Sequence, residues 1–139
     1  YNNHTKIEGN EVLKGMHTNP ERAALIEELT DYVKNNNLKG QEAVYYGDIP
    51  GLEYILKMPC AISHTWPNLG SFAYDDFVND FDKLESAPVI FVNVDCCRDI
   101  LEVGSQADKK EIFLSEYMNN NGYSLDARIG NIAIYSPKP

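Results

Sequence analysis

The sequence has few basic residues and no cluster of them. Its 139 residues include 12 lysines and arginines against 21 aspartates and glutamates, which gives a formal net charge of -9. Proteins that bind nucleic acid neutralise its phosphates with clustered basic side chains. The composition therefore excludes nucleic acid as an expected partner and predicts an acidic, well-solvated surface.

Long hydrophobic runs are missing as well. No window approaches the run of about 18 apolar residues that a membrane-spanning helix needs. The start of the chain, Tyr1 to Lys6, has neither a methionine nor the pattern of a signal peptide. We therefore expect a single α/β domain of residues 1–139, excised from a larger protein, with 1–17 forming an N-terminal arm or an edge strand.

Cysteine is scarce, with only Cys60, Cys96 and Cys97 present. They form neither a CxxC pair nor a zinc-ligand spacing, so no metal centre is predicted. Adjacent cysteines rarely bridge each other, which leaves one bridge from Cys60 to Cys96 or Cys97, or free thiols. Buried free thiols are favoured, because free cysteine is among the most buried residue types.

The apolar spacing predicts several amphipathic helices. Thr18 and Glu21 match a capping box before the first long helix, and Ser105 with Asp108 matches another before the last one. Pro50 suits the first turn of a short helix after the Gly47 turn. A further helix is predicted over residues 74–84.

Apolar runs rich in β-branched and aromatic residues predict buried strands at 43–46, 60–62 and 89–92. The alternating tail predicts two more strands, joined by a turn at Gly130-Asn131. Helices and strands thus alternate, which is typical of a three-layer α/β/α sandwich. We expect its sheet to be Rossmann-like and mainly parallel, with a C-terminal antiparallel hairpin.

The turn Gly47-Asp48-Ile49-Pro50-Gly51 lies between a predicted strand and a predicted helix. Amide groups at a helix start can hold an anion. However, the pattern is neither GxGxxG nor a phosphate-binding loop, Pro50 removes one donor, and Asp48 would repel a phosphate. A structural turn is the favoured interpretation, and Gly47 and Asp48 are candidate ligand-binding residues.

Two later loops carry further candidate residues. His64 and Trp66 follow the second predicted strand, and Asp95 and Arg98 follow the strongest one. Because the carboxyl ends of parallel strands meet at one edge of a sheet, these loops and the Gly47 turn are expected to surround one pocket. Trp66 offers a flat surface for a sugar ring, although a tryptophan that covers the edge of a core is commoner.

No complete catalytic set is recognisable in the sequence. Cys96 and His64 could form a nucleophile pair in principle, but no protease signature surrounds either residue. An acid–base pair that used Asp95 or Asp99 would need a geometry that sequence spacing does not supply. We therefore predict no catalytic residue, no metal and no cofactor for this domain.

Several stretches together carry a resemblance to a known family. They are LKGMHT at 13–18, RAAL at 22–25, YGDIPGLEY at 46–54, AISHTWPNL at 61–69, and Phe77 followed by the strand at 89–92. This layout resembles the soluble C-terminal region of bacterial multipass membrane glycosyltransferases, which take sugars from polyprenyl-linked donors. The resemblance covers most of the chain.

The resemblance implies an accessory role. In such proteins the acidic catalytic residue lies in a loop near the first membrane helices, so no catalytic residue carries over to this chain. The domain would lie on the extracytoplasmic face of a bacterial membrane, tethered by the membrane-embedded remainder of the parent chain. There it would recognise a glycan or acceptor, or support the assembly.

Two other classes of protein remain as alternatives. A free-standing α/β module would bind a nucleotide or another cofactor at the Gly47 turn. A protein-interaction domain would instead present a contiguous apolar patch, for which Tyr45, Tyr54 and Tyr74 are the candidates.

Overall fold

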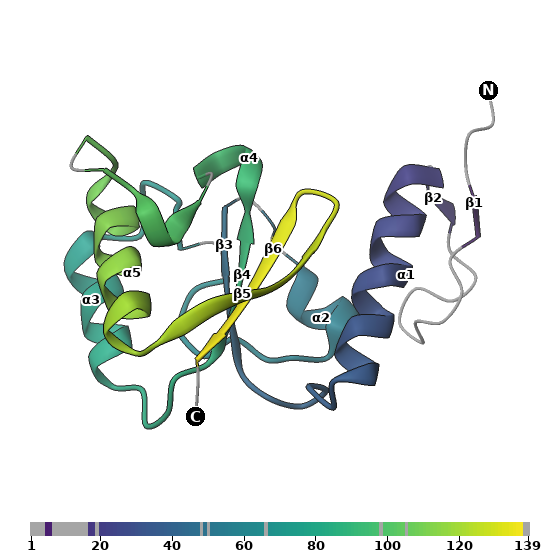
Figure 1. The fold of residues 1–139 in the computed structure, drawn as a ribbon, viewed down its shortest axis with the longest axis horizontal. Helices are drawn as coiled ribbons and strands as arrows, with labels where there is room; N and C mark the ends of the chain where they lie inside the picture. Colours follow the sequence, from purple (N-terminus) through teal and green to yellow (C-terminus); the bar gives the residue numbers. More distant parts are fainter. Residues whose placement is uncertain are drawn as a thin grey trace.

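The computed structural model describes residues 5–6, 17–18, 20–47, 49, 51–65, 67–97, 99–104 and 106–137. Helices and strands alternate along most of this length, so the chain is an α/β protein (Figure 1). The elements in chain order are β1 (Thr5–Lys6), β2 (His17–Thr18), α1 (Pro20–Asn35), β3 (Ala43–Tyr46), α2 (Leu52–Leu56), α3 (Tyr74–Asp82), β4 (Val89–Asn93), α4 (Val94–Cys97), the 3-10 helix η1 (Ile100–Glu102), α5 (Lys109–Asn120), β5 (Tyr123–Ile129) and β6 (Ile132–Pro137).

The main sheet is open and mixed, with the strand order β3-β4-β6-β5. Strands β3 and β4 run parallel, with Val44 opposite Ile90. Strand β6 pairs antiparallel with both β4 and β5. One of these three pairings is parallel and two are antiparallel. The expectation of a mainly parallel sheet is therefore not confirmed. The hairpin returns into the middle of the sheet beside β4, which turns the second half of the sheet antiparallel.

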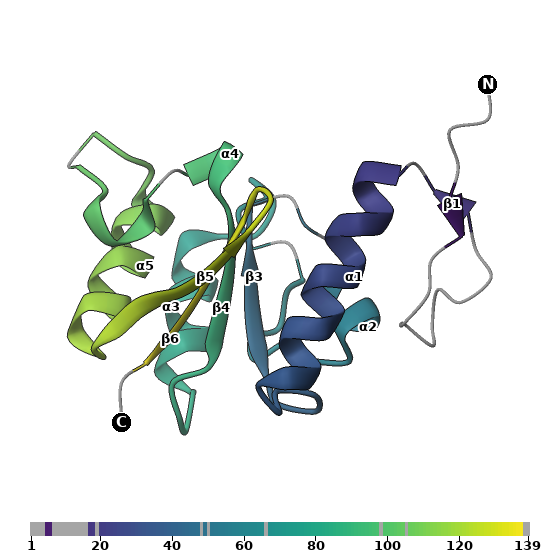
Figure 2. The same ribbon diagram turned by 45° about the vertical axis from the view of Figure 1, so that its right-hand side comes forward.

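Helices cover both faces of this sheet (Figure 2). Successive residues of a strand point to opposite faces. Val44 and Tyr46 of β3 thus pack with α3 and α5, whereas Ala43 and Tyr45 pack with α1 and α2. Strand β4 is buried on both faces, as its continuous apolar sequence predicted.

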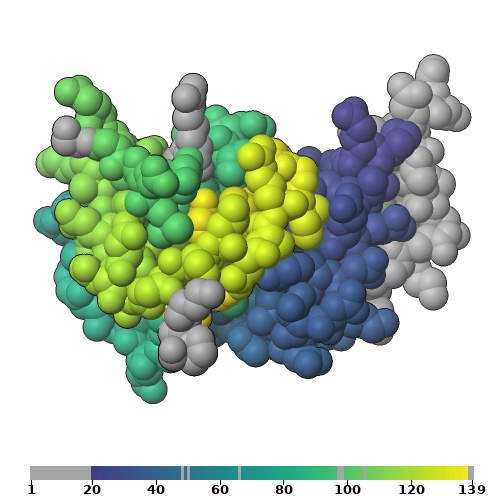
Figure 3. Space-filling model, viewed as in Figure 1, coloured from purple at the N-terminus to yellow at the C-terminus, as the bar shows by residue number. Residues whose placement is uncertain are grey.

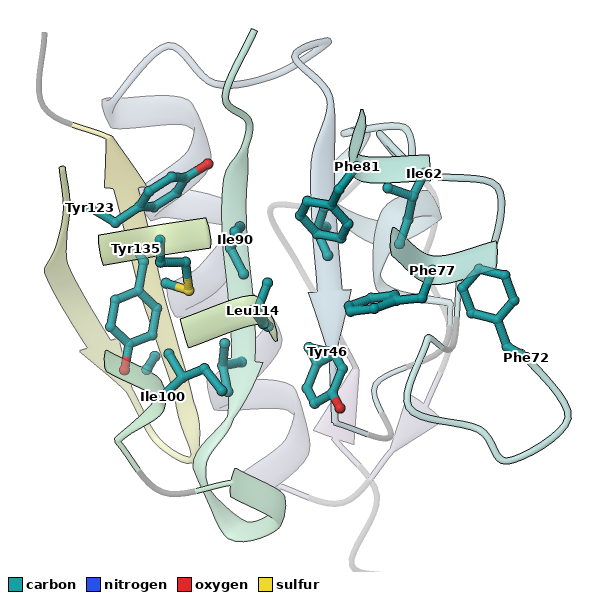
Figure 4. Packing of buried hydrophobic residues seen from close by; sticks show 14 residues of the cluster. Tyr46, Ile62, Phe72, Phe77, Phe81, Ile90, Ile100, Leu114, Tyr123 and Tyr135 are labelled. Carbon is teal, nitrogen blue, oxygen red and sulfur yellow. The ribbon is translucent and has the colours of Figure 1, made fainter. Parts of the chain in front are cut away.

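The cluster under α3 and α5 is rich in aromatic rings (Figure 4). Phe77 is fully buried and makes edge-to-face contacts with Phe72, Phe81 and Phe113 at centroid distances of 5.0 to 6.1 Å. Edge-to-face packing places the positive edge of one ring against the negative face of another. These contacts fix the α3 side of the core, including the loop that precedes α3.

The helix starts differ in part from the predicted ones. Helix α5 begins at Lys109, and its N-cap is Asp108, whose carboxylate accepts a hydrogen bond from the Lys110 amide at 3.0 Å. Ser105, which the sequence predicted as the cap, lies outside the described residues. Asp108, predicted as the acidic residue of the same capping box, is itself the N-cap. Helix α1 begins at Pro20, and Thr18 pairs in β2.

The predicted strand at 60–62 is not formed. Cys60 makes only an isolated parallel bridge to Ala43 at the outer edge of β3. The chain then leaves the sheet, because the Ser63 amide and hydroxyl both donate to the carboxylate of Asp80 on α3. Two backbone hydrogen bonds of Ala43, one accepted from the Ala61 amide and one donated to the Pro59 carbonyl, hold the start of this segment, and the Asp80 carboxylate holds it at Ser63.

Two more features complete the fold. Strands β5 and β6 form the predicted hairpin around Gly130 and Asn131, but the register shifts between Leu125 and Ala127, which interrupts the expected alternation. The N-terminal segment contributes the short antiparallel pair β1–β2, and the rest of the predicted arm at 1–17 lies outside the described residues.

Candidate functional site

The carboxyl ends of β3 and β4 form a topological switch point. After β3 the chain enters α2, which packs on the same face as α1. After β4 it passes through α4 and η1 to α5, and Ile100 and Leu114 pack on the opposite face. When the chain continues to opposite faces of the sheet after two neighbouring parallel strands, a crevice opens at the carboxyl ends of those strands. Proteins of the α/β class commonly bind ligands in such a crevice.

Gly47 closes β3 at this edge and touches the end of β4. Its φ of 99° lies in the left-handed region, and a β-carbon there would be 3.0 Å from Cβ of Asn93. The Gly47 amide donates to Oδ1 of Asn68 at 3.1 Å. The turn therefore requires glycine for both conformation and space, and its amide is already hydrogen-bonded within the protein.

Asn93 and Asn131 link β4 to the turn of the β5–β6 hairpin. Oδ1 of Asn93 accepts from the Asp95 amide at 2.9 Å and from Nδ2 of Asn131 at 3.3 Å. Nδ2 of Asn131 also lies 3.3 Å from Oδ2 of Asp95. In addition, the Val94 amide donates to the Asn131 carbonyl at 2.9 Å. The edge is thus a connected network of amides and one carboxylate.

Lys110 anchors the loop on the other side of the crevice. It is only 7% exposed, and its ammonium donates to the carbonyls of Pro67 (2.8 Å), Leu69 (3.0 Å) and Phe72. It also lies 5.2 Å from the ring centroid of Phe72. Burial lowers the pKa of Lys110, and the Asp108 carboxylate acts in the opposite direction. One buried ammonium thus fixes the segment that carries Asn68.

A cavity of about 700 Å³ opens between this loop, α4 and the start of α5. Its polar lining includes Asn68, Asp108, Lys109 and Glu111, and Tyr74 adds an aromatic ring. The Lys109 ammonium lies 5.9 Å from the centroid of the Tyr74 ring. The pKa of Glu111 is raised by burial and by the Asp108 carboxylate. The cavity therefore offers amide, carboxylate and ammonium groups in a partly desolvated setting.

The predicted site residues are only partly brought together. Gly47 and Asp95 meet at the switch point, joined through Asn93. His64 is instead stacked, at a centroid distance of 4.8 Å, on Phe72, which itself lines the cavity. Three predicted residues lie outside the described part of the chain: Asp48, Trp66 and Arg98.

Sequence reasoning missed the residues that build the edge. Asn68, Asn93, Asn131 and Lys110 were not among the candidates, although Asn93 directly follows the strongest strand and Asn131 sits in the predicted hairpin turn. Their spacing in sequence gave no signal that they would meet. Lys110 was indistinguishable from an exposed helix lysine, because its acceptors are backbone carbonyls more than 35 residues away.

The candidates for catalysis and metal binding are placed as follows among the described residues. Cys96 is exposed on α4, whereas His64 packs on the Phe72 ring. Among the described residues, no group of three or more His, Cys, Asp or Glu side chains could hold a metal ion. Helix α2 has five residues and Gly47 already donates to Asn68, so the Gly47 turn offers little to a phosphate.

The tyrosines proposed for an interaction patch do not form one surface. Tyr45 is 2% exposed, stacks on Phe91 at 5.2 Å and donates to the Met58 carbonyl at 2.6 Å, so its prediction as a surface residue was wrong. Tyr54 is 70% exposed on α2, and Tyr74 is exposed at the start of α3. Helices α2 and α3 cover opposite faces of the sheet, so these two rings cannot share a patch.

Cys60 and Cys96 are free thiols, but they differ in setting. Cys60 is partly buried, and desolvation together with the Glu53 carboxylate raises its pKa to about 11. Cys96 is exposed, so the predicted burial was wrong for that thiol. The side chain of Cys97 lies outside the described structure.

Cys60 is expected to be alkylated by iodoacetamide about a hundredfold more slowly at about pH 8 in the folded chain than in concentrated urea. The thiolate is the nucleophile, and raising the pKa from 9.0 to about 11 lowers its fraction by that factor. The rate should rise tenfold per pH unit toward the raised pKa. Mass spectrometry of the Cys60 peptide measures this, with the exposed Cys96 as internal reference. Equal rates in folded and unfolded chain would contradict it.

Comparison with protein-family models, curated proteins and solved structures finds no significant match. Within the described residues, no helix is both long and apolar enough to cross a membrane. The functional argument therefore depends on the geometry of the described residues, above all on the cavity between the 67–72 loop, α4 and the start of α5.

Proposed function

We propose that this domain is an accessory recognition domain that binds a glycan or a glycan-bearing acceptor and does not itself catalyse a reaction. The observation that carries the proposal is the cavity beside the switch point, lined by Asn68, Asp108, Lys109 and Glu111. Sugar hydroxyls are both donors and acceptors, so amides, carboxylates and an ammonium ion are suitable partners. Helices on both faces of the sheet support classing the domain as a Rossmann-like three-layer sandwich.

The cellular setting of the proposal comes from the family resemblance. It supports a domain tethered to the extracytoplasmic face of a bacterial membrane by the remainder of a glycosyltransferase-like chain. Sequencing the gene upstream of Tyr1 tests this part. Several runs of about 20 apolar residues are expected there, and a start codon close to Tyr1 would contradict the tethering.

Glycan binding is tested by titrating the isotope-labelled protein with cellobiose, mannobiose and maltotriose and recording amide NMR shifts. At least one saccharide is expected to shift the amides around Asn68 and Lys109, with a dissociation constant of about 1 mM. Glu111→Gln removes a charged acceptor inside the cavity and should weaken binding about tenfold. Glu116→Gln, exposed on the same helix, should leave it unchanged.

The pH dependence provides a second readout of the same site. Because burial and Asp108 raise the pKa of Glu111, its carboxylate is protonated at a higher pH than an ordinary glutamate. Saccharide binding should therefore weaken as the pH falls through this raised value, and Glu111→Gln should remove that dependence. Absence of any saccharide-induced shift in this cavity across the panel would overturn the proposed function.

A further inference from the structure

The aromatic side chains that line the glycan cavity differ in how far a ligand can reach them. The glycan cavity is the space between the 67–72 loop, α4 and the start of α5, and its described lining includes Tyr46, Phe72 and Tyr74. Tyr46 and Phe72 are buried in the core, whereas 38% of Tyr74 is exposed. Figure 3 shows α3, which begins at Tyr74, beside α5 on the side of the molecule away from α1. Of these three rings, Tyr74 is the one that a ligand can reach.

The Tyr74 ring is held in place by the aromatic part of the core. It meets the ring of Phe113 edge-to-face, at a centroid distance of 6.5 Å and an interplanar angle of 87°. Phe113 in turn makes edge-to-face contacts with the buried rings of Phe77 and Phe81, at 5.7 and 5.5 Å. These contacts orient Tyr74 before any ligand arrives. A preformed surface binds more tightly than one that must first be ordered, because less conformational entropy is lost.

One face of the Tyr74 ring is turned toward the polar wall of the cavity. The Lys109 ammonium lies over this ring, 5.9 Å from its centroid, and the neighbouring Asp108 and Glu111 line the same wall. A cation attracts an aromatic face only within about 6 Å of the ring centroid. Because Lys109 is exposed and lies close to that limit, its attraction to the ring is weak. A ligand can therefore take the place of the ammonium on the ring.

A pyranose matches this combination of an aromatic face and a polar wall. Its ring carries C–H bonds on a face and hydroxyl groups around the rim. The C–H face is apolar and packs on the negative face of an aromatic ring, while the hydroxyls can donate to the carboxylates of Asp108 and Glu111. An acyclic polyol offers the same hydroxyls but no fixed C–H face, so the cavity should distinguish the two.

We infer that Tyr74 is the stacking platform of the glycan cavity, and that the ligand is a pyranose whose C–H face lies on this ring in place of the Lys109 ammonium. The inference rests on the proposed function and adds to it the residue that distinguishes a sugar ring from other hydroxyl-bearing molecules. Trp66, the residue that the sequence offered for this role, lies outside the described residues.

The test uses the full chain with cellobiose, mannobiose and maltotriose, and records the NMR signals of the sugar as well as those of the protein. Protons over an aromatic face are shifted upfield by the ring current, so C–H protons on one face of the bound sugar should move upfield. Tyr74→Leu keeps an apolar contact with Phe113 but has no ring. It should remove the upfield shift and weaken binding about tenfold, with urea unfolding used to verify that it folds.

Two further variants serve as controls. Tyr74→Phe retains the ring and should keep the upfield shift and an affinity within about twofold of the wild type. Tyr54→Leu removes an exposed tyrosine from α2, which covers the opposite face of the sheet, and should change neither the upfield shift nor the affinity.

A comparison of competitors needs no variant. D-Glucitol, an acyclic polyol, should displace the bound saccharide about tenfold less effectively than methyl β-D-glucopyranoside, which has the ring. Equal competition by the two, or amide shifts around Asn68 and Lys109 without an upfield shift of sugar protons, would overturn the inference and leave the proposed function standing. Absence of amide shifts with every saccharide would overturn both.

Discussion

Replacement of Lys110 by methionine is expected to lower the free energy of unfolding by about 3 kcal/mol. The ammonium donates to three backbone carbonyls, and two of these belong to the buried residues Pro67 and Phe72. Backbone acceptors cannot be removed with the lysine, so each buried one is left unsatisfied at about 1–3 kcal/mol. Packing of methionine on the Phe72 ring, and relief from burying a charge, offset part of that loss.

Urea unfolding followed by circular dichroism measures the Lys110→Met effect. Lys109→Met is the matched control, because the neighbouring side chain is exposed, and it should change stability by about 0.5 kcal/mol or less. Loss of the loop anchor should also broaden the NMR signals of residues 67–72. A Lys110→Met protein as stable as the control would show that the three carbonyl contacts contribute nothing.

Substitution of Gly47 by alanine is expected to lower the free energy of unfolding by about 3 kcal/mol. About 1–2 kcal/mol comes from forcing a β-carbon into the left-handed region at a φ of 99°. The remainder comes from contact with Asn93, whose backbone nitrogen and oxygen would each lie 3.3 Å from the new carbon. Backbone atoms of a central strand cannot move aside cheaply, so β3 and β4 must separate at their carboxyl ends.

Gly40 provides the matched control for this prediction. Its φ of 89° is similar, but a β-carbon there would have nothing within 4 Å. Gly40→Ala should therefore cost only the conformational part, about 1–2 kcal/mol. Urea unfolding of both variants isolates the contact with Asn93 as the difference. Equal losses would show that conformational strain alone makes glycine necessary at position 47.

Local patterns in the sequence predicted the elements well where one segment supplies its own signal. The apolar run at 89–92 identified β4, and Gly130-Asn131 identified the hairpin turn. The run at 60–62 failed because apolar character alone does not show which backbone partner is available. There Ser63 hydrogen-bonds Asp80 and takes the chain away from the sheet. The pairing of β6 with β4 likewise joins residues that are far apart in the sequence, and no local pattern predicts it.

The predicted site residues stay a prediction, and none of the described ones lines the cavity beside the switch point. The rule that ligands meet strand carboxyl ends correctly brought Gly47 and Asp95 to one edge. The amide network depends on Asn93 and Asn131, which are 38 residues apart and meet only through β6 pairing. The loop at residues 67–72 is held in place by Lys110, whose partners are backbone carbonyls that any residue could provide. Neither arrangement leaves a residue pattern that sequence spacing can reveal.

The register shift in β5 has a consequence for self-association. β5 is the last strand in the order of the main sheet, so one of its edges has no strand partner within the described structure. Such an edge can template pairing with another chain. Irregularities of the kind found between Leu125 and Ala127 increase the local twist of a strand, and exposed Asp126 and Arg128 place charges along β5. Leu125, although 53% exposed, is therefore poorly placed to seed intermolecular β-sheet growth.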